Sequence, residues 1–168
     1  MSVVADILKS YRAPKAVALA RLERATEPAA LATLIAGCLI LFIAQWPRLG
    51  RAAHFDPSIP LDARISGAIM GIMFVLPLFM YVLAGLVFLL FRLIKIETTG
   101  LFVRTALFWS LLAGAPLWLM HGFFSGYLGS SGLVSAMGLV LLAAYLFVLV
   151  GCLRAAVVED VERQTGDA

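Results

Sequence analysis

Four apolar stretches that almost no charge interrupts fill most of this chain of 168 residues. They run roughly over 28–46, 65–91, 101–119 and 132–153. Each has close to the number of residues, about 20, that a helix needs to cross a hydrocarbon core about 30 Å thick. The sequence therefore predicts an all-α fold, a polytopic transmembrane helical bundle with four spans.

The composition agrees with a membrane protein and excludes a water-soluble domain. Hydrophobic residues make up 62% of the chain and charged residues 14%, whereas soluble domains average about 25% charged residues. No water-soluble core of so short a chain has room for four such stretches. The two cysteines, Cys38 and Cys152, both fall inside predicted spans, which argues against a disulfide framework or a zinc site.

The placement of the cations predicts the orientation of the bundle. Ten of the thirteen Lys and Arg residues flank the spans on the side of the two termini, and three flank them on the other side. The three are Arg48, Arg51 and Arg64. The positive-inside rule then places both termini in the cytoplasm, and we expect a protein of the bacterial inner membrane.

Three regions follow from this layout. Residues 1–27 form an amphipathic cytoplasmic segment, 28–155 the transmembrane domain, and 156–168 a short acidic tail. In the first region Val4, Leu8 and Tyr11 recur at helical spacing, and Pro14 is suited to open a second short helix. Such a basic segment either lies on an anionic leaflet or packs on the protein's own cytoplasmic loops, and the two are compatible.

Prolines and glycines divide the spans. Pro47 is expected to end the first span and to begin an exterior loop over 47–64. Pro77 predicts a kink in the long second span, which gives five spans if it splits that helix in two. The third span contains Pro116 and leads into a glycine-rich outer turn over 122–132, which either dips into the interface or turns tightly. We expect helix packing at four positions, Gly67, Gly71, Pro77 and Pro116, of which the first two form a Gly-x-x-x-Gly pair.

The polar groups predict a binding protein and not an enzyme. The sequence has no serine-hydrolase elbow, zinc-protease motif, Walker sequence or Cys-x-x-Cys. We therefore expect no catalytic residue, no cofactor and no metal ligand. The candidate contacts with lipid or with a partner are Lys9, Arg12, Lys15, Arg104, Gln45 and His121. Arg104 alternatively serves as a simple cytoplasmic anchor, and Gln45 as a hydrogen-bond partner of a neighbouring helix.

Some of these residues carry a resemblance to a known family. The stretch Ile7-Leu8-Lys9-Ser10-Tyr11-Arg12-Ala13-Pro14-Lys15-Ala16-Val17 precedes the first span, and Gly100-Leu101-Phe102-Val103-Arg104-Thr105-Ala106-Leu107 leads into a span with Pro116. In these features the chain resembles the bacterial branch of the Yip (Ypt/Rab-interacting protein) family over roughly residues 7–153. The resemblance implies an integral membrane fold, typically with five spans. In eukaryotes it also implies small-GTPase partners and a role in vesicle traffic.

Two functional hypotheses follow. The first is a non-enzymatic integral membrane protein that acts as a scaffold, as an assembly or accessory subunit of a membrane complex, or as a membrane-organising protein. The alternative is a small transporter or lipid-handling protein, with broken helices around a polar cavity near Gln45, Ser110 and His121. The expected partners are membrane lipids and a membrane-protein partner or a second copy of the chain, and no nucleic acid.

Overall fold

The computed structural model describes residues 2–96, 98–129 and 131–166, with the backbone alone over 158–166. Within these residues every regular element is a helix. The α-helices are α1 (Val3–Ser10), α2 (Pro14–Leu22), α3 (Glu27–Phe55), α4 (Leu61–Ile69), α5 (Leu76–Leu93), α6 (Gly100–Ala113), α7 (Ala115–Leu128) and α8 (Gly132–Gly166), and a π-helix, η1 (Met70–Val75), joins α4 to α5. The all-α prediction is confirmed.

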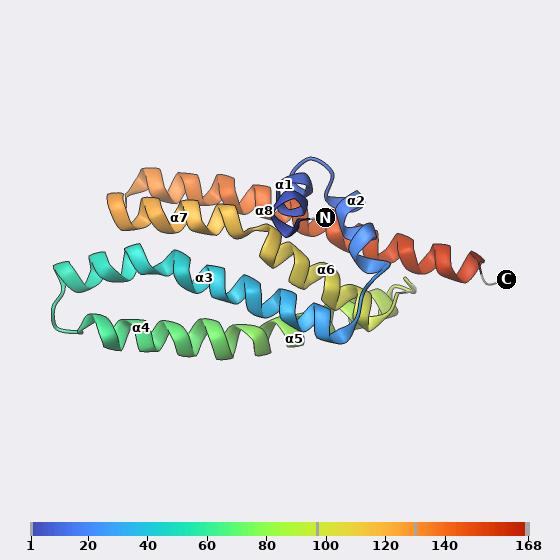
Figure 1. The fold of residues 1–168 in the computed structure, drawn as a ribbon, viewed down its shortest axis with the longest axis horizontal. Coiled ribbons are helices and arrows are strands. Elements are labelled where there is room, and N and C mark those ends of the chain that lie inside the picture. Colours follow the sequence, from blue (N-terminus) through green and yellow to red (C-terminus); the bar gives the residue numbers. More distant parts are fainter. Residues whose placement is uncertain (1, 97, 130, 167–168) are drawn as a thin grey trace.

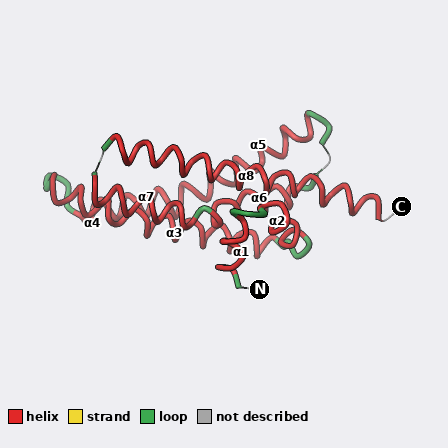
Figure 2. The backbone as a smooth tube through the Cα atoms, turned by 90° about the horizontal axis from the view of Figure 1, so that it is seen from above, coloured by secondary structure: helices red, strands yellow, loops and turns green. Residues whose placement is uncertain are grey.

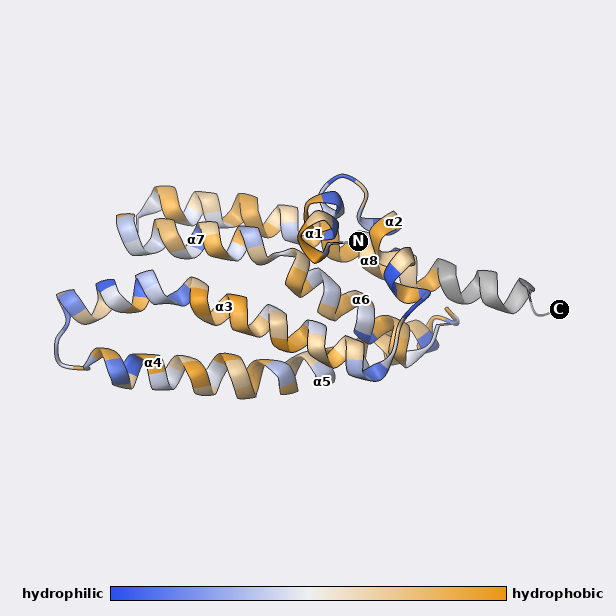
Figure 3. Cartoon of the chain, viewed as in Figure 1, coloured by the Kyte–Doolittle hydropathy of each residue, from blue (hydrophilic) through white to orange (hydrophobic). Residues whose placement is uncertain are grey.

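The long helices run up and down one axis, as Figure 1 shows. Three helical stretches of the described chain are long and apolar enough to cross a membrane: Glu27–Phe55, Leu61–Leu93 and Gly132–Val157. The pair α6 and α7, bent by 41°, makes a fourth if it is one span. Hydrophilic residues gather toward both ends of the long axis and on the connection between α1 and α2, and the middle parts of the long helices are mainly apolar (Figure 3).

Pro47 does not end the first span, so that prediction is wrong. Helix α3 continues through Pro47 to Phe55, and the exterior loop shrinks to residues 56–60. An interior proline loses one backbone hydrogen bond, but Pro47 here lies against Gly126 of α7, and this contact helps to hold the helix together. Arg64 closes the short loop through an ion pair with Asp56 at 3.0 Å.

Pro77 leaves the second pass in one piece. The helical run continues from Leu61 to Leu93, and the π-helix η1 ends two residues before Pro77. A proline ring collides with the carbonyl four residues earlier in a regular α-helix. The wider π-turn relieves that collision, so the span adapts to Pro77 without dividing into two.

The third pass differs most from the sequence prediction. Residues 122–128, predicted to belong to an outer turn, are helical and continue α7 to Leu128. The pass breaks instead at Gly114, between α6 and α7, and Pro116 lies in the first turn of α7, where its missing N–H is tolerated. A Cβ at Gly122 would overlap the carbonyl of Ala44 on α3. This glycine is a close-packing residue and not a turn residue.

Helix α6 forms the centre of the molecule. Ten of its residues are buried, and they contribute to two apolar clusters. One cluster joins α6 to the N-terminal helices and α8 through Trp109, Ala113 and Cys152. The other joins α6 to α3 and α5 through Phe108, Cys38 and Met80. The core therefore depends on α6, the first half of the third pass.

The N-terminal helices lie on one side of the bundle, and α5 lies on the opposite side (Figure 2). Pro14 opens α2 at its first position, as predicted. At the other terminus the backbone of α8 continues through most of the predicted acidic tail, to Gly166. Glu97, residues 167 and 168, and the side chains of 158–166 lie outside the described part of the chain.

Candidate functional site

Helix α1 docks on the bundle by its polar side. Asp6, Ile7 and Ser10 are buried, while Val4 is 65% exposed and Leu8 62% exposed. A helix at the surface of a soluble protein shows the opposite arrangement, with its apolar stripe facing the core. Val4 and Leu8 of the predicted apolar stripe therefore face outwards, whereas Tyr11 and the neighbouring Ile7 pack against the protein.

A network of polar contacts explains this docking. Arg21 of α2 forms an ion pair with Asp6 at 2.7 Å, and its guanidinium lies over the Trp109 ring, 3.9 Å from the centroid. The Trp109 Nε1 donates to the Ser10 hydroxyl at 3.2 Å. The Ser10 hydroxyl in turn donates to the Asp6 carbonyl at 2.9 Å. Each buried polar group of α1 therefore has a partner, as burial requires.

A further hydrogen bond ties α1 to the break in the third pass. The Tyr11 hydroxyl donates to the carbonyl of Ala113 at 2.6 Å, and the indole N–H of Trp118 donates to the carbonyl of Leu111 at 3.3 Å. Both carbonyls lie in the last turn of α6, where a helix end leaves acceptors without backbone partners. Burial raises the pKa of Tyr11 to about 12, because the phenolate loses its solvation there.

A cavity of about 640 Å³ opens beside this network, between the N-terminal helices and the spans. Its walls come from α1, α2, the start of α3, and Thr105 and Trp109 of α6. Glu27 begins α3, and Thr33 lies six residues further, about 9 Å along the span at ~1.5 Å per residue. The cavity therefore extends from the end of the bundle into its apolar part.

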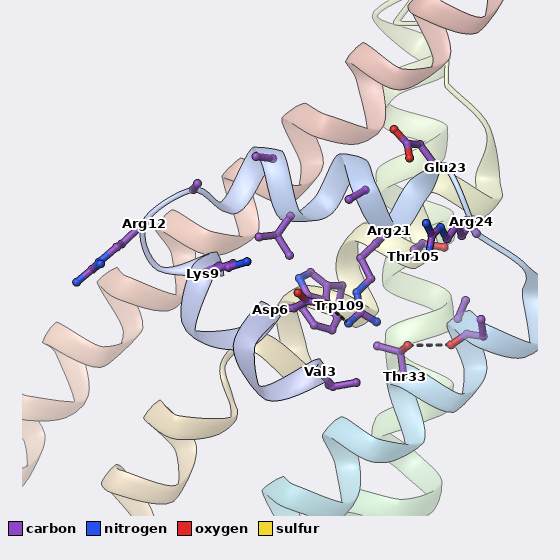
Figure 4. Close-up of a pocket in the computed structure, with 17 residues that line it drawn as sticks. Val3, Asp6, Lys9, Arg12, Arg21, Glu23, Arg24, Thr33, Thr105 and Trp109 are labelled. Atoms are coloured by element: carbon purple, nitrogen blue, oxygen red, sulfur yellow. Dashed lines mark hydrogen bonds and ion pairs between the residues drawn. The ribbon is translucent and has the colours of Figure 1, made fainter. Parts of the chain in front are cut away.

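Cations surround the cavity. Its lining includes Lys9, Arg12, Arg21 and Arg24, against the two carboxylates of Asp6 and Glu23. Figure 4 shows that Arg21 turns toward Asp6 and Trp109, and that Arg12 extends away from the other labelled side chains. Among the described residues Arg21 alone of these four forms an ion pair. The lining therefore keeps an excess of positive charge.

One hydroxyl group on the cavity wall lacks a partner. The Oγ1 atom of Thr105 is buried and makes no hydrogen bond with any described residue, although Thr105 lines the cavity. Thr33, on the opposite wall, donates to the carbonyl of Ala29 at 2.8 Å, which is the usual arrangement for a threonine in a membrane helix. Thr105 does not follow this arrangement, and its hydrogen-bonding capacity remains unused.

Two of the contact residues predicted from the sequence line the cavity, and two lie near it. Lys9 and Arg12 line the cavity, and Lys15 is exposed on α2 outside its lining. Arg104 forms an ion pair with Glu27 at 2.6 Å, and its Nε donates to the carbonyl of Gly100 at 3.1 Å. Arg104 thus joins the starts of α3 and α6.

The remaining predicted residues lie elsewhere. Gln45 is half-buried on α3 and does not line the cavity. His121 is half-buried on α7 and faces Gly138 of α8, where an added Cβ would lie 3.1 Å from its Nε2. Gly67 and Gly71 are exposed, and a Cβ at either would have no described atom within 4 Å outside its own helix. They make no close contact with another helix of the chain.

Sequence reasoning missed the residues at the centre of the network: Asp6, Ser10, Arg21, Thr105 and Trp109. The detectable signal was the pairing of two polar residues, Asp6 and Ser10, four positions apart on a helix that precedes a span. That spacing places them on one face. Arg21 and Trp109 carried no signal of this kind, because their meeting depends on how α2 docks on α6.

No group of three or more His, Cys, Asp and Glu side chains that could hold a metal ion occurs in the described part of the chain. No protein-family model, curated protein or solved structure matches the chain.

Proposed function

We propose that this chain is a non-enzymatic integral membrane protein of the Yip-like class, which acts by binding at the cytoplasmic surface of the membrane. In this proposal α1 and α2 form a platform that gathers anionic lipid around the bundle and so organises the membrane next to it. The four passes cross the bilayer, and both termini lie in the cytoplasm.

The observation that carries this proposal is the orientation of α1. Asp6 and Ser10 face the protein, and Val4 and Leu8 face outwards beside the cation of Lys9. Apolar side chains flanked by cations are typical of helices that lie in the interface of an anionic leaflet. With lipid around the molecule, the exposed apolar stripe is buried in acyl chains, and the arrangement becomes favourable.

The depth of the platform supports the same proposal. Trp109, on which Arg21 lies, is nine residues into α6, about 13 Å at ~1.5 Å per residue. Interfacial helices lie about 5–10 Å into the headgroup and acyl boundary. Helix α1 and Tyr11 contact α6 from Trp109 to Ala113, at and below this depth, so we expect the outer face of α1 to meet acyl chains close to the headgroups.

The orientation of α1 is tested by measuring how deeply its outer face lies. We expect a spin label at Leu8→Cys to be accessible to oxygen, which dissolves in acyl chains, and shielded from a water-soluble nickel reagent. A label at Ser58→Cys in the exterior loop serves as the water-exposed control. If the label at position 8 is as accessible to nickel as the control, α1 faces water and the platform proposal fails.

A scaffold or accessory-subunit function is the second candidate, and a different surface favours it. The run Leu61–Leu93 is the least buried of the candidate spans, with 11% of its apolar window buried, and Gly67 and Gly71 are exposed on it. Small residues at this spacing let a second helix approach closely in a membrane. This surface suits a membrane-protein partner or a second copy of the chain.

Less supports the transporter alternative. Ser110 is buried and donates to the carbonyl of Leu107 in its own helix at 2.7 Å, and His121 packs against Gly138. Neither side chain lines the cavity described above. The lipid-handling part of that alternative coincides with the platform, because the cavity opens beside it.

A further inference from the structure

We infer that the cavity between α1, α2, α3 and α6 binds an anionic phospholipid, attracted by the cations of Lys9 and Arg24 and bonded by the hydroxyl of Thr105. This inference rests on the proposed function, because it needs the platform to lie at the membrane surface. It adds a defined binding site, with a ligand class, to what would otherwise be a general attraction to anionic lipid.

The charges of the lining favour an anion. Asp6 is occupied by Arg21, and Figure 4 shows Glu23 pointing away from the centre of the cavity. Lys9 and Arg24 line the cavity, and neither makes an ion pair with any described residue. A phosphate offers the acceptor oxygens that such donors lack, and charge-assisted hydrogen bonds of this kind are among the strongest.

The walls favour an amphiphile over a free phosphate ion. Beyond the cations the lining is apolar, with Val17 on α2, Ala29 and Ala30 on α3, and the Trp109 ring on α6. The volume of about 640 Å³ lies within the range of ligand cavities, about 300–1,000 Å³. It leaves room for the glycerol group and the first acyl carbons beside a phosphate, which is the order of polar and apolar groups in a phospholipid.

Thr105 supplies an observation that the charges do not. A buried hydroxyl group without a partner is unfavourable, so folded proteins seldom contain one. The Oγ1 atom of Thr105 is such a group, and the protein's own atoms close it off from the cavity that other atoms of Thr105 line. In a helix threonine splits between two χ1 rotamers, and a turn about this bond brings the hydroxyl to the cavity, where the acceptor oxygens of a ligand give it a partner.

The experiment measures retained lipid by native mass spectrometry of the full chain, purified in mild detergent with phosphatidylglycerol or with phosphatidylcholine. We expect one phosphatidylglycerol to remain on the wild type. Removing one cation should weaken retention about fivefold, and the double variant Lys9→Gln and Arg24→Gln correspondingly more. Lys15→Gln, which removes an exposed cation outside the cavity, is the matched control and should retain lipid as the wild type does.

Thr105→Val keeps the shape of the side chain and removes the hydroxyl. We expect it to weaken phosphatidylglycerol retention while the melting temperature of the lipid-free protein stays the same or rises. Inorganic phosphate distinguishes the two sources of the anion: displacement of the lipid by millimolar phosphate would identify a site for the free ion and overturn the lipid assignment.

The remaining outcomes separate the site from the platform. Equal retention by the wild type, the double variant and Thr105→Val overturns the site. If Val4→Ser with Leu8→Ser then lowers the number of bound anionic lipids, the proposed function stands without the site. If neither set of substitutions changes lipid binding, both proposals fail.

Discussion

Trp109 connects the two halves of the candidate site. Its ring face holds the guanidinium of Arg21, and its N–H holds the hydroxyl of Ser10. A tryptophan can make both contacts at once because the face of the ring is negative and the edge carries a donor. One side chain therefore contacts both α1 and α2, and phenylalanine, which has no N–H, cannot replace it.

The ion pair between Asp6 and Arg21 should stabilise the docked platform more than a similar exposed pair does. Its side chains are 11% and 29% exposed, so Asp6→Asn leaves a half-buried cation unpaired and should cost about 1.5–3 kcal/mol. The readout is the rate of protease cleavage between α2 and α3. Glu27→Gln breaks the more exposed pair with Arg104 and should cost only about 0.2–1 kcal/mol; equal acceleration by both variants would contradict the assignment.

Tyr11 should make the docking of α1 sensitive to alkaline pH. Its pKa is raised to about 12 from the ordinary value of 10.0, so the docked state favours the neutral phenol. The stabilisation is fully present below pH 10 and is lost as the pH rises through about 12. We expect cleavage between α1 and α2 to accelerate over this range in the wild type and to lose that dependence in Tyr11→Phe. Tyr127→Phe, at an exposed position, should behave as the wild type.

At the scale of elements, the glycines decide how closely the helices approach. Gly122 and Gly126 of α7 bring its backbone against Ala44 and Pro47 of α3, the kind of contact that membrane helices use when apolar burial provides no driving force. Gly151 of α8 likewise admits the ring of Pro14, whose Cγ would lie 2.6 Å from an added Cβ. Two glycines thus join α7 to α3, and a third joins α2 to α8.

Gly122→Ala should separate α7 from α3. The added Cβ meets backbone atoms of Ala44, which cannot rotate away, and overpacking of this kind costs about 1–3 kcal/mol. The measurement is thermal unfolding in detergent, followed by circular dichroism. Gly85→Ala in α5, where a Cβ meets nothing within 4 Å, is the control and should not lower the melting temperature. Equal losses in both variants would show that the contact is not close.

The sequence predicted the apolar passes because apolarity is a property of a segment, independent of its neighbours. It failed where the outcome depends on a neighbour. Pro47 was predicted to end a helix and Pro77 to kink one. Pro47 instead packs against α7, and a π-turn accommodates Pro77. The stretch around Gly122 and Gly126 was predicted to be a turn because it is rich in glycine. The four-residue spacing of these two glycines also fits a close contact between helices.

The candidate site was predicted in part for a related reason. Helical spacing showed which face of α1 is apolar, and it led to Lys9 and Arg12. It could not show that part of the apolar face points away from the protein, because that choice depends on whether lipid or water surrounds the helix. The contacts of Trp109 with Ser10 and Arg21 join residues far apart in the chain, and spacing carries no information about such contacts.

At the scale of the whole molecule, the two ends differ in construction. One end has the connections between α3 and α4 and between α7 and α8, and toward the other lie α2, the start of α3 and the connection between α5 and α6. Cations are concentrated at the second end, which the positive-inside rule assigns to the cytoplasm. The cavity opens near this end, so the proposed orientation places it at the leaflet in which anionic lipid is abundant.

Cysteine labelling in intact bacterial cells tests this orientation. Cys38 and Cys152 are buried, so the wild type should not react with a membrane-impermeant maleimide. Ser58→Cys in the exterior connection should react in intact cells, and Lys95→Cys between α5 and α6 only after the membrane is permeabilised. The reverse pattern would place the platform on the outer surface and contradict the proposed orientation.

The two exposed glycines of the second pass predict the assembly state. If Gly67 and Gly71 meet a second copy of the chain, Gly71→Leu should reduce the native mass in detergent from that of a dimer to that of a monomer. Its melting temperature should stay close to that of the wild type, because a Cβ at this position meets no other atom of the chain within 4 Å. If the wild type is already a monomer, Gly67 and Gly71 do not contact a second copy of the chain.

The docking of α1 on α6 also sets the order in which the molecule is completed. Helices α1 and α2 leave the ribosome first, since synthesis proceeds from the N-terminus, but their partners on α6 and α8 are made last. Until α6 is inserted, Ser10 has no indole N–H to accept from and Tyr11 has no carbonyl of α6 to bind. In the proposed arrangement the nascent α1 and α2 therefore wait on the membrane surface, and the cavity, whose walls come from α1, α2, α3 and α6, forms once α6 is in place.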